Sequence, residues 1–377
     1  SHSQDSSRCS PARSPPPSLR RRGRDVARDA RPWSAFEHHA MRRALELAAQ
    51  GARSTQPNPR VGCVIAVGER IIGEGWHQRS GEPHAEVFAL REAGKGARGA
   101  TAFVTLEPCN HHGRTPPCSE ALIAAGVAHV IYACGDPNPR VDGTGAARLR
   151  EAGIVVEHGL EQVAGEELNL GFFSRMRRGR PWLRLKLAAS LDGRTALANG
   201  ESRWITSAEA RADVQRFRAE SAAILSTSAT VLADDPELTA REGEVTRQPL
   251  RVILDAHGRV PATARIFSAP GRTVCLTREQ IAVDAAGRLN LPAVLAWMGG
   301  AELNEVWTEA GPTLAETLLA AELVDELVLY LAPRLLGPTA RPLAAWPDLE
   351  RLADSPSWQV RDLRQIGPDI RIMLRRH

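Results

Sequence analysis

The chain has 377 residues, of which 43% are hydrophobic and 24% charged, and its formal net charge is +4. This length predicts two or three domains, and the hydrophobic fraction is large enough for each domain to bury a core. No apolar run approaches the ~20 residues that a membrane-spanning helix needs, so we expect a globular protein without a membrane partner. Six cysteines scattered along the chain are too few and too dispersed for a disulfide framework.

The first 32 residues are rich in serine, proline and arginine. They hold eight arginines and three aspartates, so this tail carries the positive charge and leaves the remaining chain at −1. With almost no aliphatic side chains the tail cannot bury enough surface to fold, and we expect it to be disordered. It could be an organelle transit peptide, a nucleic-acid-binding arm or upstream sequence without a role. The last is favoured, because the aspartates do not fit a transit peptide.

Helices and strands alternate from Trp33 to about residue 178. The expected elements are, in order, the helix "FEHHAMRRALELAAQGA", two short strands, a helix after His84, a strand at 101–106, a helix from Cys118, the strand "AHVIYAC", a helix at 143–152, the strand "GIVVEHG" and a helix near 161–174. This alternation predicts a mixed sheet with helices on both faces.

The loop "TLEPCNHHGRTPPC" at 105–118 brings cysteines and histidines close together. Zinc takes nitrogen and sulfur ligands, and a catalytic zinc leaves one of its four positions to water. A strand leads into Cys109, and Cys118 begins a helix, whose dipole lowers the pKa of a thiol. In "SGEPHAEVFALREAG", His84 and Glu86 stand at the start of another helix. We therefore predict that His84, Cys109 and Cys118 bind zinc, with Glu86 carrying the protons of the water.

This arrangement matches the zinc-deaminase signature, H-x-E followed by P-C-x-x-C, except that eight residues instead of two separate the cysteines. The longer loop "EPCNHHGRTPPC" resembles that of the RibD family of riboflavin-biosynthesis pyrimidine deaminases, where "EPCSHxGRTPPC" is usual and Asn110 here replaces the serine. Upstream, "PNPRVGCVIAVGERIIGEGWH" resembles the strand-turn-strand start of that family. The resemblance implies that Asn58 contacts substrate, and it places His111 and His112 in the substrate loop.

A second layered αβ domain follows a linker marked by Gly179 and Pro181, so we expect a deaminase domain at 33–178 and another domain at 179–377. The expected elements are the strand "WLRLKLAASLDG", a helix at 207–219, the strands "SAAILSTSATVLADDP", "LRVILDAHG", "TVCLTR" and "NEVWTEAG", a helix at 312–321, and the strands "VDELVLYLAP" and "IRIMLRR".

Two glycine patterns have different meanings. "GKGARG" at 94–99 satisfies G-x-G-x-x-G, but a helix precedes it and a strand follows, which is the reverse of the dinucleotide fingerprint. We interpret it as an ordinary helix-to-strand loop. In "WTEAGPTLAETLL" a strand leads into a helix through a Gly-Pro-Thr turn, and the free amides of such a helix start can bind a phosphate.

Four segments of the second domain resemble, in the same order, the dihydrofolate-reductase-like domain of the RibD family: "LKLAASLDGRTA", "GESRWITS", "RAESAAILSTSATVLADDPELTAR" and "TEAGPTLAE". The resemblance implies a cytidine-deaminase-like three-layer αβα domain followed by a dihydrofolate-reductase-like αβ domain. It implies a bifunctional enzyme that deaminates 2,5-diamino-6-(5-phosphoribosylamino)pyrimidin-4(3H)-one. The enzyme then uses NADPH to reduce the ribosyl group of 5-amino-6-(5-phosphoribosylamino)uracil to ribityl.

The resemblance also assigns residues of the second site. Those that contact the cofactor are Ala188, Trp204, Thr230, Asp234, Gly311, Pro312 and Thr313. Those that contact the substrate are Ser202, Arg218, Leu238, Arg241 and Glu309. We add Lys186 as a substrate contact, because it is a polar group flanking "LAAS" near the expected hydride-transfer centre. The arginines suit the 5-phosphate, since a guanidinium offers paired donors.

The second domain departs from the family pattern in two places. Ala256 stands where many relatives have a serine that helps to hold the cofactor. The stretch 276–303 is short for the family, so the sequence does not decide whether the strand and helix expected there are present. The sequence also leaves two roles for Asp192, which either lies near the hydride-transfer centre or shapes a turn.

Two other functions fit parts of the sequence. A deaminase of tRNA bases or free nucleosides needs a basic, aromatic-rich face, which 5% aromatic residues and a near-neutral body disfavour, so we expect no nucleic-acid partner. A structural zinc module that binds a partner protein needs a fourth protein ligand, which His111 or His112 could supply. We expect a cytoplasmic location, because no signal peptide is visible and thiolate ligands need a reducing compartment. A homo-oligomer is compatible with the sequence.

Overall fold

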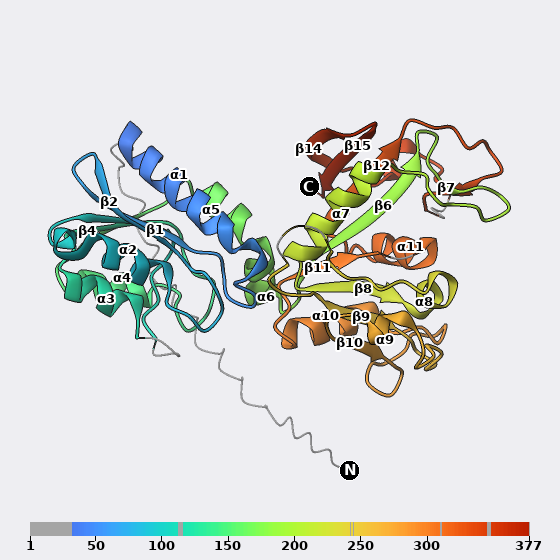
Figure 1. Cartoon of the computed structure of the whole chain (residues 1–377), viewed down its shortest axis with the longest axis horizontal. Coiled ribbons are helices and arrows are strands. Elements are labelled where there is room, and N and C mark those ends of the chain that lie inside the picture. Colours follow the sequence, from blue (N-terminus) through green and yellow to red (C-terminus); the bar gives the residue numbers. More distant parts are fainter. Residues whose placement is uncertain are drawn as a thin grey trace, which may run out of the picture. The chain divides into compact units, whose positions relative to one another are not determined.

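The computed structural model describes residues 32–111, 116–241, 243, 245–309, 311–344 and 348–376 (Figure 1). The chain divides into two units, Ser1–Ser34 and Ala35–His377, and every helix and strand below belongs to the second. The tail expected to be disordered therefore lies almost entirely outside the described residues. Within those residues no helix combines the length and the apolar character needed to cross a membrane.

The first part of Ala35–His377 is a five-stranded sheet with helices on both faces. Its strands are β1 (Gly62–Val67), β2 (Arg70–Trp76), β3 (Thr101–Leu106), β4 (His129–Cys134) and β5 (Val155–His158). Its helices are α1 (Ala35–Ala49), α2 (Ala85–Ala93), α3 (Cys118–Ala125), α4 (Thr144–Glu151), α5 (Gln162–Leu168) and α6 (Leu170–Arg178), with 3₁₀ turns at Gln50–Arg53 and Gly94–Ala97.

The strand order is β2-β1-β3-β4-β5, in which β1 runs antiparallel to both neighbours and β3, β4 and β5 are parallel. Helices α1 and α5 lie on one face of this sheet, and α2, α3 and α4 lie on the other (Figure 1). β1 and β3 are almost wholly buried, as expected for strands covered on both faces. The predicted three-layer αβα arrangement is confirmed, and "GKGARG" forms the 3₁₀ turn between α2 and β3, as an ordinary connection.

The second part contains an eight-stranded sheet and a two-stranded ribbon. The strands are β6 (Trp182–Ser190), β7 (Arg194–Ala196), β8 (Ala223–Thr227), β9 (Leu250–Leu254), β10 (Thr273–Leu276), β11 (Glu305–Thr308), β12 (Glu326–Ala332), β13 (Arg341–Pro342), β14 (Gln359–Ile366) and β15 (Asp369–Arg375). The helices are α7 (Ala208–Glu220), α8 (Ser228–Asp234), α9 (Arg265–Ser268), α10 (Leu291–Gly300) and α11 (Pro312–Ala320), with a 3₁₀ turn at Leu352–Asp354.

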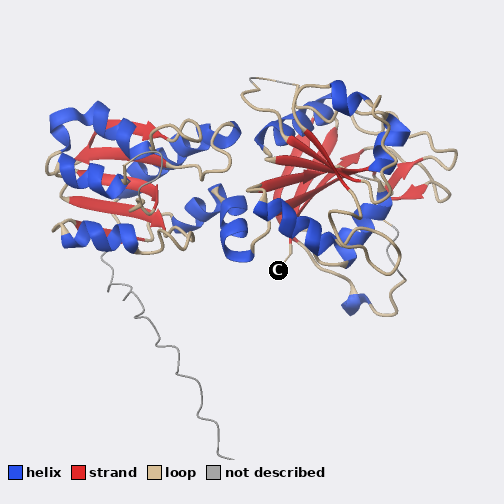
Figure 2. Cartoon of the chain, turned by 90° about the horizontal axis from the view of Figure 1, so that it is seen from below, coloured by secondary structure: helices blue, strands red, loops and turns tan. Residues whose placement is uncertain are grey.

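The large sheet has the order β10-β9-β8-β11-β6-β12-β15-β14. The six strands from β10 to β12 are parallel, and β15 and β14 add an antiparallel edge. Figure 2 shows these strands fanned between helices. Because parallel strands end at one edge of a sheet, the starts of α8 and α11 and the loop after β9 come together there.

Two expected elements differ from the structure. The strand expected over "SAAILSTSATVLADDP" ends at Thr227, because the Thr227 side chain accepts a hydrogen bond from the Thr230 amide and caps α8. The single helix expected near 161–174 is two helices, α5 and α6, with a break at Asn169. The buried Asn169 side chain bonds the backbone N–H and C=O of Arg60 at 2.8 and 2.9 Å, and this long-range contact interrupts the helix.

The stretch 276–303, which is short for the family, contains the expected helix, whereas the strand lies almost entirely before it. β10 ends in it at Leu276 and pairs in parallel with β9. α10 is capped by the Asn290 side chain, which accepts a hydrogen bond from the Ala293 amide. The strands β7, β13 and β14 were not expected from the sequence.

Candidate active sites

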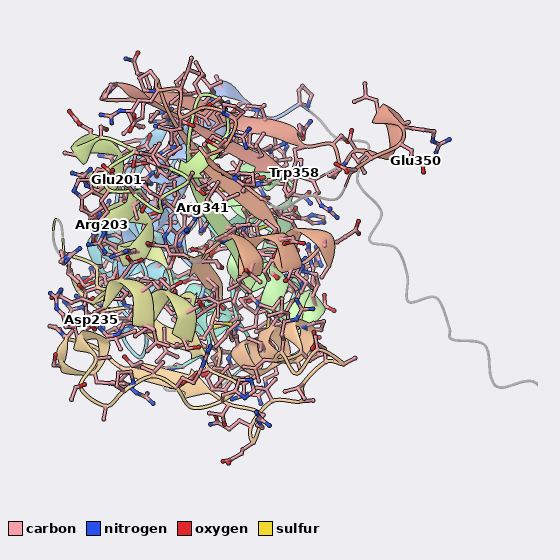
Figure 3. The ribbon with its side chains drawn as sticks, turned by 90° about the vertical axis from the view of Figure 1, so that its right-hand side faces the viewer. Glu201, Arg203, Asp235, Arg341, Glu350 and Trp358 are labelled. Atoms are coloured by element: carbon pink, nitrogen blue, oxygen red, sulfur yellow. The ribbon has the colours of Figure 1, made fainter. Side chains whose placement is uncertain are left out.

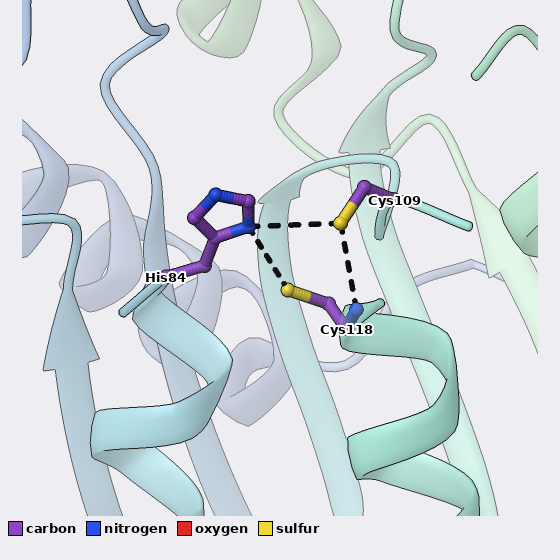
Figure 4. Close-up of side chains that lie close together, drawn as sticks. All are labelled: His84, Cys109 and Cys118. Atoms are coloured by element: carbon purple, nitrogen blue, oxygen red, sulfur yellow. Dashed lines mark hydrogen bonds between the residues drawn. The ribbon is translucent and has the colours of Figure 1, made fainter. Parts of the chain in front are cut away.

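Three potential metal ligands converge in the first part of the chain. The ligand atoms of His84, Cys109 and Cys118 all lie within 4.8 Å of one another. His84 Nδ1 is 3.2 Å from Cys118 Sγ and 3.6 Å from Cys109 Sγ (Figure 4). One imidazole and two thiols form a donor set that suits zinc, and three protein ligands are typical of catalytic rather than structural zinc sites.

Local structure fixes these three side chains. His84 is the N-terminal cap residue of α2, Cys118 is the first residue of α3, and Cys109 follows β3. The Cys118 amide donates to Cys109 Sγ at 3.4 Å, and the Ser119 amide donates to the Cys109 carbonyl at 3.1 Å. Asn110, which replaces the family's usual serine, accepts a hydrogen bond from the Ser119 hydroxyl at 2.9 Å. The start of the cysteine loop is therefore fastened to α3.

The two thiols behave as a pair. The pKa of Cys109 is lowered, because the Cys118 thiol and the His84 ring donate hydrogen bonds to its sulfur. The pKa of Cys118 is raised, because its thiol proton donates a hydrogen bond to the Cys109 sulfur and because the thiol is buried. The hydrogen bond to Cys109 therefore outweighs the lowering of the Cys118 pKa that was expected from the dipole of α3. Metal binding to thiols releases such protons, so the pair fits a cation.

Glu86 lies beside these ligands in the first turn of α2. Its side chain is only 3% exposed, and burial raises its pKa. Among the described residues no hydrogen-bond partner contacts its buried Oε2 atom. Buried polar atoms almost always have partners, and the exceptions gather at functional sites. A carboxyl group in this state fits a residue that accepts and returns protons.

His77, which the sequence analysis missed, connects Asn58 to the metal ligands. Its ring packs edge-on against His84 with the centroids 5.2 Å apart. His77 Nδ1 donates to the Pro83 carbonyl, so its Nε2 accepts from the Asn58 side-chain amide, and both distances are 3.1 Å. Burial lowers the pKa of His77, which favours the neutral ring that this pattern requires. Asn58 is thereby held at the site.

Asp136 and Glu107 were also missed, because single acidic residues after strands are common. β3 and β4 are parallel neighbours, so Asp136 after β4 lies near the loop that begins after β3. Burial, together with the charges of Glu107 and Cys109, raises the pKa of Asp136 to about 7. The Glu107 carboxylate accepts hydrogen bonds from the Gly143 and Ala146 amides at 3.0 and 3.1 Å, which fixes this loop on the start of α4.

The proposed fourth protein ligand is not supported for His111. Among the described residues, the group able to hold a metal contains His84, Cys109 and Cys118 but not His111. The His111 Nδ1 atom is buried without a hydrogen-bond partner in the part of the chain that the structure describes. His112 lies outside the described residues.

A second site lies in a cavity of about 1610 Å³ at the edge of the large sheet where its parallel strands end. All the residues expected at the cofactor and substrate sites of the second domain line this cavity: Lys186, Ala188, Ser202, Trp204, Arg218, Thr230, Asp234, Leu238, Arg241, Glu309, Gly311, Pro312 and Thr313. Figure 3 views this end of the chain, with the cavity-lining residues Arg203, Asp235 and Arg341 labelled. The volume exceeds the ~300–1,000 Å³ of an ordinary ligand pocket, so two ligands fit together.

Glu309 and Arg218 form the polar centre of this cavity. Arg218 Nε and an NH₂ group donate to the two Glu309 oxygens at 2.6 and 2.7 Å, and Trp307 Nε1 donates to Glu309 at 2.8 Å. Burial alone would raise the pKa of Glu309, but the Arg218 charge outweighs it and holds the pKa at about 2. Burial lowers the pKa of the neighbouring Lys186. The cavity therefore offers a fixed acceptor and a donor side by side.

The two arginines expected to bind the 5-phosphate differ. The Arg218 guanidinium is engaged by Glu309 and also donates to the Thr239 carbonyl at 3.0 Å, so it holds Glu309 rather than facing open space. Arg241 is exposed, and among the described residues its guanidinium contacts only Glu237, at 3.4 Å. Of the two, Arg241 is the more available for an anion.

The remaining residues lie around the rim and the helix starts. Gly311 caps α11, and Thr230 lies in the first turn of α8, so amides of both helices point to the cavity edge. The Trp204 ring is 61% exposed and carries the Arg211 guanidinium 4.4 Å above its centroid. Asp192 is outside the cavity lining and accepts hydrogen bonds from the Leu336 and Gly337 amides, which favours the turn-shaping interpretation.

Comparison with protein families gives two matches. Residues 181–372 match the RibD C-terminal domain, and residues 35–134 match the cytidine and deoxycytidylate deaminase zinc-binding region. The chain is 52% identical to the riboflavin biosynthesis protein RibD of Escherichia coli over 89% of this chain and 98% of that protein. It is 48% identical to the protein of the same name in Haemophilus influenzae, over 88% of this chain and 95% of the relative.

Solved structures agree with these matches. Acinetobacter baumannii RibD in its form 1 superposes with a TM-score of 0.85 at 44% identity, covering 91% of this chain and 99% of the other. A Thermotoga maritima diaminohydroxyphosphoribosylaminopyrimidine deaminase/5-amino-6-(5-phosphoribosylamino)uracil reductase superposes with a TM-score of 0.81 at 32% identity, with the same coverage.

Proposed function

The chain belongs to the RibD family, and from that premise we propose which of its residues perform the two reactions. The family combines a zinc-dependent deaminase with an NADPH-dependent reductase of riboflavin biosynthesis, and this chain has both domains. We propose domain limits of 33–178 and 179–377, which are supported by the two separate sheets.

In the deaminase site, His84, Cys109 and Cys118 would hold zinc, and their donor set and spacing fit that ion. When bound, zinc lowers the pKa of a coordinated water towards neutrality and so supplies hydroxide at working pH. Glu86 takes the first proton of the attacking water and passes it to the pyrimidine ring nitrogen. It then takes the second proton from the hydroxyl group that has added to the ring carbon and gives it to the exocyclic amino group, which leaves as ammonia while the ring carbonyl forms. Its raised pKa suits a carboxyl group that must both accept and return a proton.

Asn58 and Asp136 would bind the substrate in this site. His77 accepts from one Asn58 amide hydrogen, which leaves the other donor and the carbonyl of Asn58 for the pyrimidine or its ribose. Asp136 offers a buried carboxyl group near Cys109, so it can pair with an amino group of the ring.

In the reductase site, the protein supplies position and charge to NADPH, which delivers the hydride. Glu309, kept ionised by Arg218, accepts from a ribose hydroxyl, and Lys186 beside it donates to a substrate oxygen. Arg241 at the rim contacts the 5-phosphate. Amides at the starts of α8 and α11 face the cofactor, as helix starts do with phosphates.

The observation that carries this proposal is that both residue sets assemble. The three zinc ligands, distant in sequence, meet within 4.8 Å, and every residue assigned to the reductase lines one cavity. The proposed partners are small phosphoribosylated pyrimidines, with no nucleic acid. The thiol ligands support a cytoplasmic location, and light scattering tests self-association.

Incubating the zinc-loaded protein with the diamino substrate, with and without NADPH, tests this function. Ammonia release and NADPH oxidation are followed together. We expect ammonia in the absence of NADPH, and NADPH oxidation that lags behind ammonia. Ammonia without any NADPH oxidation would contradict the reductase assignment, and oxidation without prior ammonia would contradict the proposed order.

A further inference from the structure

The segment 56–60, which contains the residue proposed to bind the deaminase substrate, bonds to the second domain at both of its ends. At one end the Gln56 side-chain amide donates to the Glu302 carbonyl at 2.5 Å. At the other end the Arg60 guanidinium donates to the carboxylate of the buried Glu305 at 2.9 Å. The start of β11 and the turn before it therefore receive this segment.

Asn304 bonds to the middle of the same segment. Its side-chain amide donates to the Pro57 carbonyl at 2.9 Å, and the Arg175 guanidinium donates to the same oxygen at 3.2 Å. Arg175 also donates through Nε to Asn304 Oδ1 at 2.7 Å. Because Asn304 is buried, the loss of its side chain would leave the groups that it satisfies without a partner, and this is costly.

The Pro57 carbonyl belongs to the peptide group that ends at the Asn58 nitrogen. The Asn58 amide of this group donates to the Thr55 carbonyl at 2.8 Å, so both polar atoms of one planar unit are hydrogen-bonded. The orientation of this unit determines where the Asn58 side chain begins, and His77 accepts a hydrogen bond from that side chain at 3.1 Å. Asn304 is therefore connected to Asn58 through a single rigid peptide group.

Asn304 itself stands on a fixed support. Its backbone carbonyl accepts a hydrogen bond at 2.8 Å from the amide of Trp182, the first residue of β6. Helix α6, which carries Arg175, packs closely here, because a Cβ atom at Gly171 would lie only 2.6 Å from the Asn304 carbonyl oxygen. Residues that bind substrate need such a supporting layer to keep their geometry. The large sheet provides it for Asn58.

We propose that Asn304, a residue of the reductase domain, is a positioning residue for the deaminase reaction. It holds the peptide group before Asn58, so that the Asn58 side chain meets the pyrimidine substrate in a fixed orientation. The inference rests on the substrate contact proposed above for Asn58. Zinc and Glu86 are held by residues of 33–178 alone, so the loss of Asn304 should weaken substrate binding and spare zinc binding and proton transfer.

Steady-state deamination by the zinc-loaded full chain tests the inference in Asn304→Ala and Asn304→Asp. The Asp variant keeps the acceptor of the side chain but replaces its donor by a carboxylate oxygen. We expect both variants to raise the KM of the diamino substrate about 3- to 10-fold and to change kcat by less than about twofold. Zinc content and NADPH oxidation on supplied deaminated substrate should stay at wild-type values, and thermal unfolding verifies that each variant folds.

Thr246→Val is the matched control for contacts between the two sheets. The Thr246 hydroxyl donates to the Arg53 carbonyl at 2.9 Å, which lies outside the segment 56–60. Its loss should leave the KM of the diamino substrate unchanged.

A double-mutant cycle shows whether Asn304 acts through Asn58. Asn58→Ala removes the substrate contact itself, so adding Asn304→Ala to it should raise KM by less than about twofold further. Fully additive increases in KM would overturn the inference, because Asn304 would then act by another route.

The other outcomes are distinguishable. An unchanged KM in both Asn304 variants would overturn the inference, and so would an equal loss of deamination and NADPH oxidation, which would give Asn304 a general structural role. Normal deamination by Asn58→Ala would instead remove the proposed substrate contact of Asn58, and the inference with it.

Discussion

Gly145 is a glycine on which the deaminase site depends without contacting the zinc ligands. It lies in the first turn of α4, and a Cβ atom at this position would be 1.8 Å from the Pro108 carbonyl oxygen. Real Cβ contacts are essentially never shorter than 3.0 Å, so Gly145→Ala must displace Pro108 or α4 by at least 1.2 Å. Zinc sites tolerate only about 0.2 Å in a ligand distance. Because Pro108 precedes Cys109, we expect the substitution to disturb the zinc site.

The expected loss follows from the cost of overpacking, about 1–3 kcal/mol. If this strain acts on the bound state, zinc affinity falls by about 5- to 150-fold. Chelator competition measures the affinity, and ammonia release should fall with it while NADPH oxidation on deaminated substrate stays unchanged. Gly135→Ala is the matched control, because a Cβ there meets nothing within 4 Å. Wild-type zinc affinity and deamination in Gly145→Ala would show that the contact with Pro108 does not position Cys109.

Two further predictions concern the cysteine thiols and the Glu309 carboxylate of the reductase cavity. Removing zinc with a chelator should let Cys109 react with a thiol reagent, while the buried Cys63 and Cys134 stay unlabelled. Peptide mass spectrometry shows the order in which the cysteines are labelled. Labelling of Cys63 before Cys109 would contradict the zinc assignment. Burial raises the pKa of Glu309, but the Arg218 charge outweighs burial and holds this pKa at about 2, below the value of about 4.5 in the unfolded chain. The ionised Glu309 therefore stabilises the fold above pH 4.5, and this stabilisation is lost as the pH falls towards 2. Glu309→Gln should remove on the order of 3 kcal/mol of this pH dependence in denaturant unfolding, and an unchanged slope would count against the ion pair.

The zinc ligands could be predicted because each stands at a recognisable junction of strand, loop and helix. His84 and Cys118 begin helices, and Cys109 follows an apolar strand, so local patterns placed them before their convergence was seen. His77 could not be predicted in the same way. Its meaning depends on contacts with Asn58 and Pro83 that only the folded chain provides.

The errors in secondary structure also have physical causes. The apolar run 222–225 favours a strand, but the side-chain cap of Thr227 starts α8 at the next residue. Asn169 interrupts a helical pattern because it bonds the backbone of Arg60, 109 residues away in sequence. The Arg218–Glu309 pair was likewise hidden, because sequence alone does not show which of several arginines faces a buried carboxylate.

One chain carries two separate active sites, and the Glu86→Gln variant distinguishes one from the other. The variant keeps the three zinc ligands but removes the proton carrier, so it should bind zinc normally and release no ammonia from the diamino substrate. With deaminated substrate supplied, it should oxidise NADPH at the wild-type rate, because the residues of that cavity are untouched. Loss of both activities in a folded, zinc-loaded variant would contradict the two-site account.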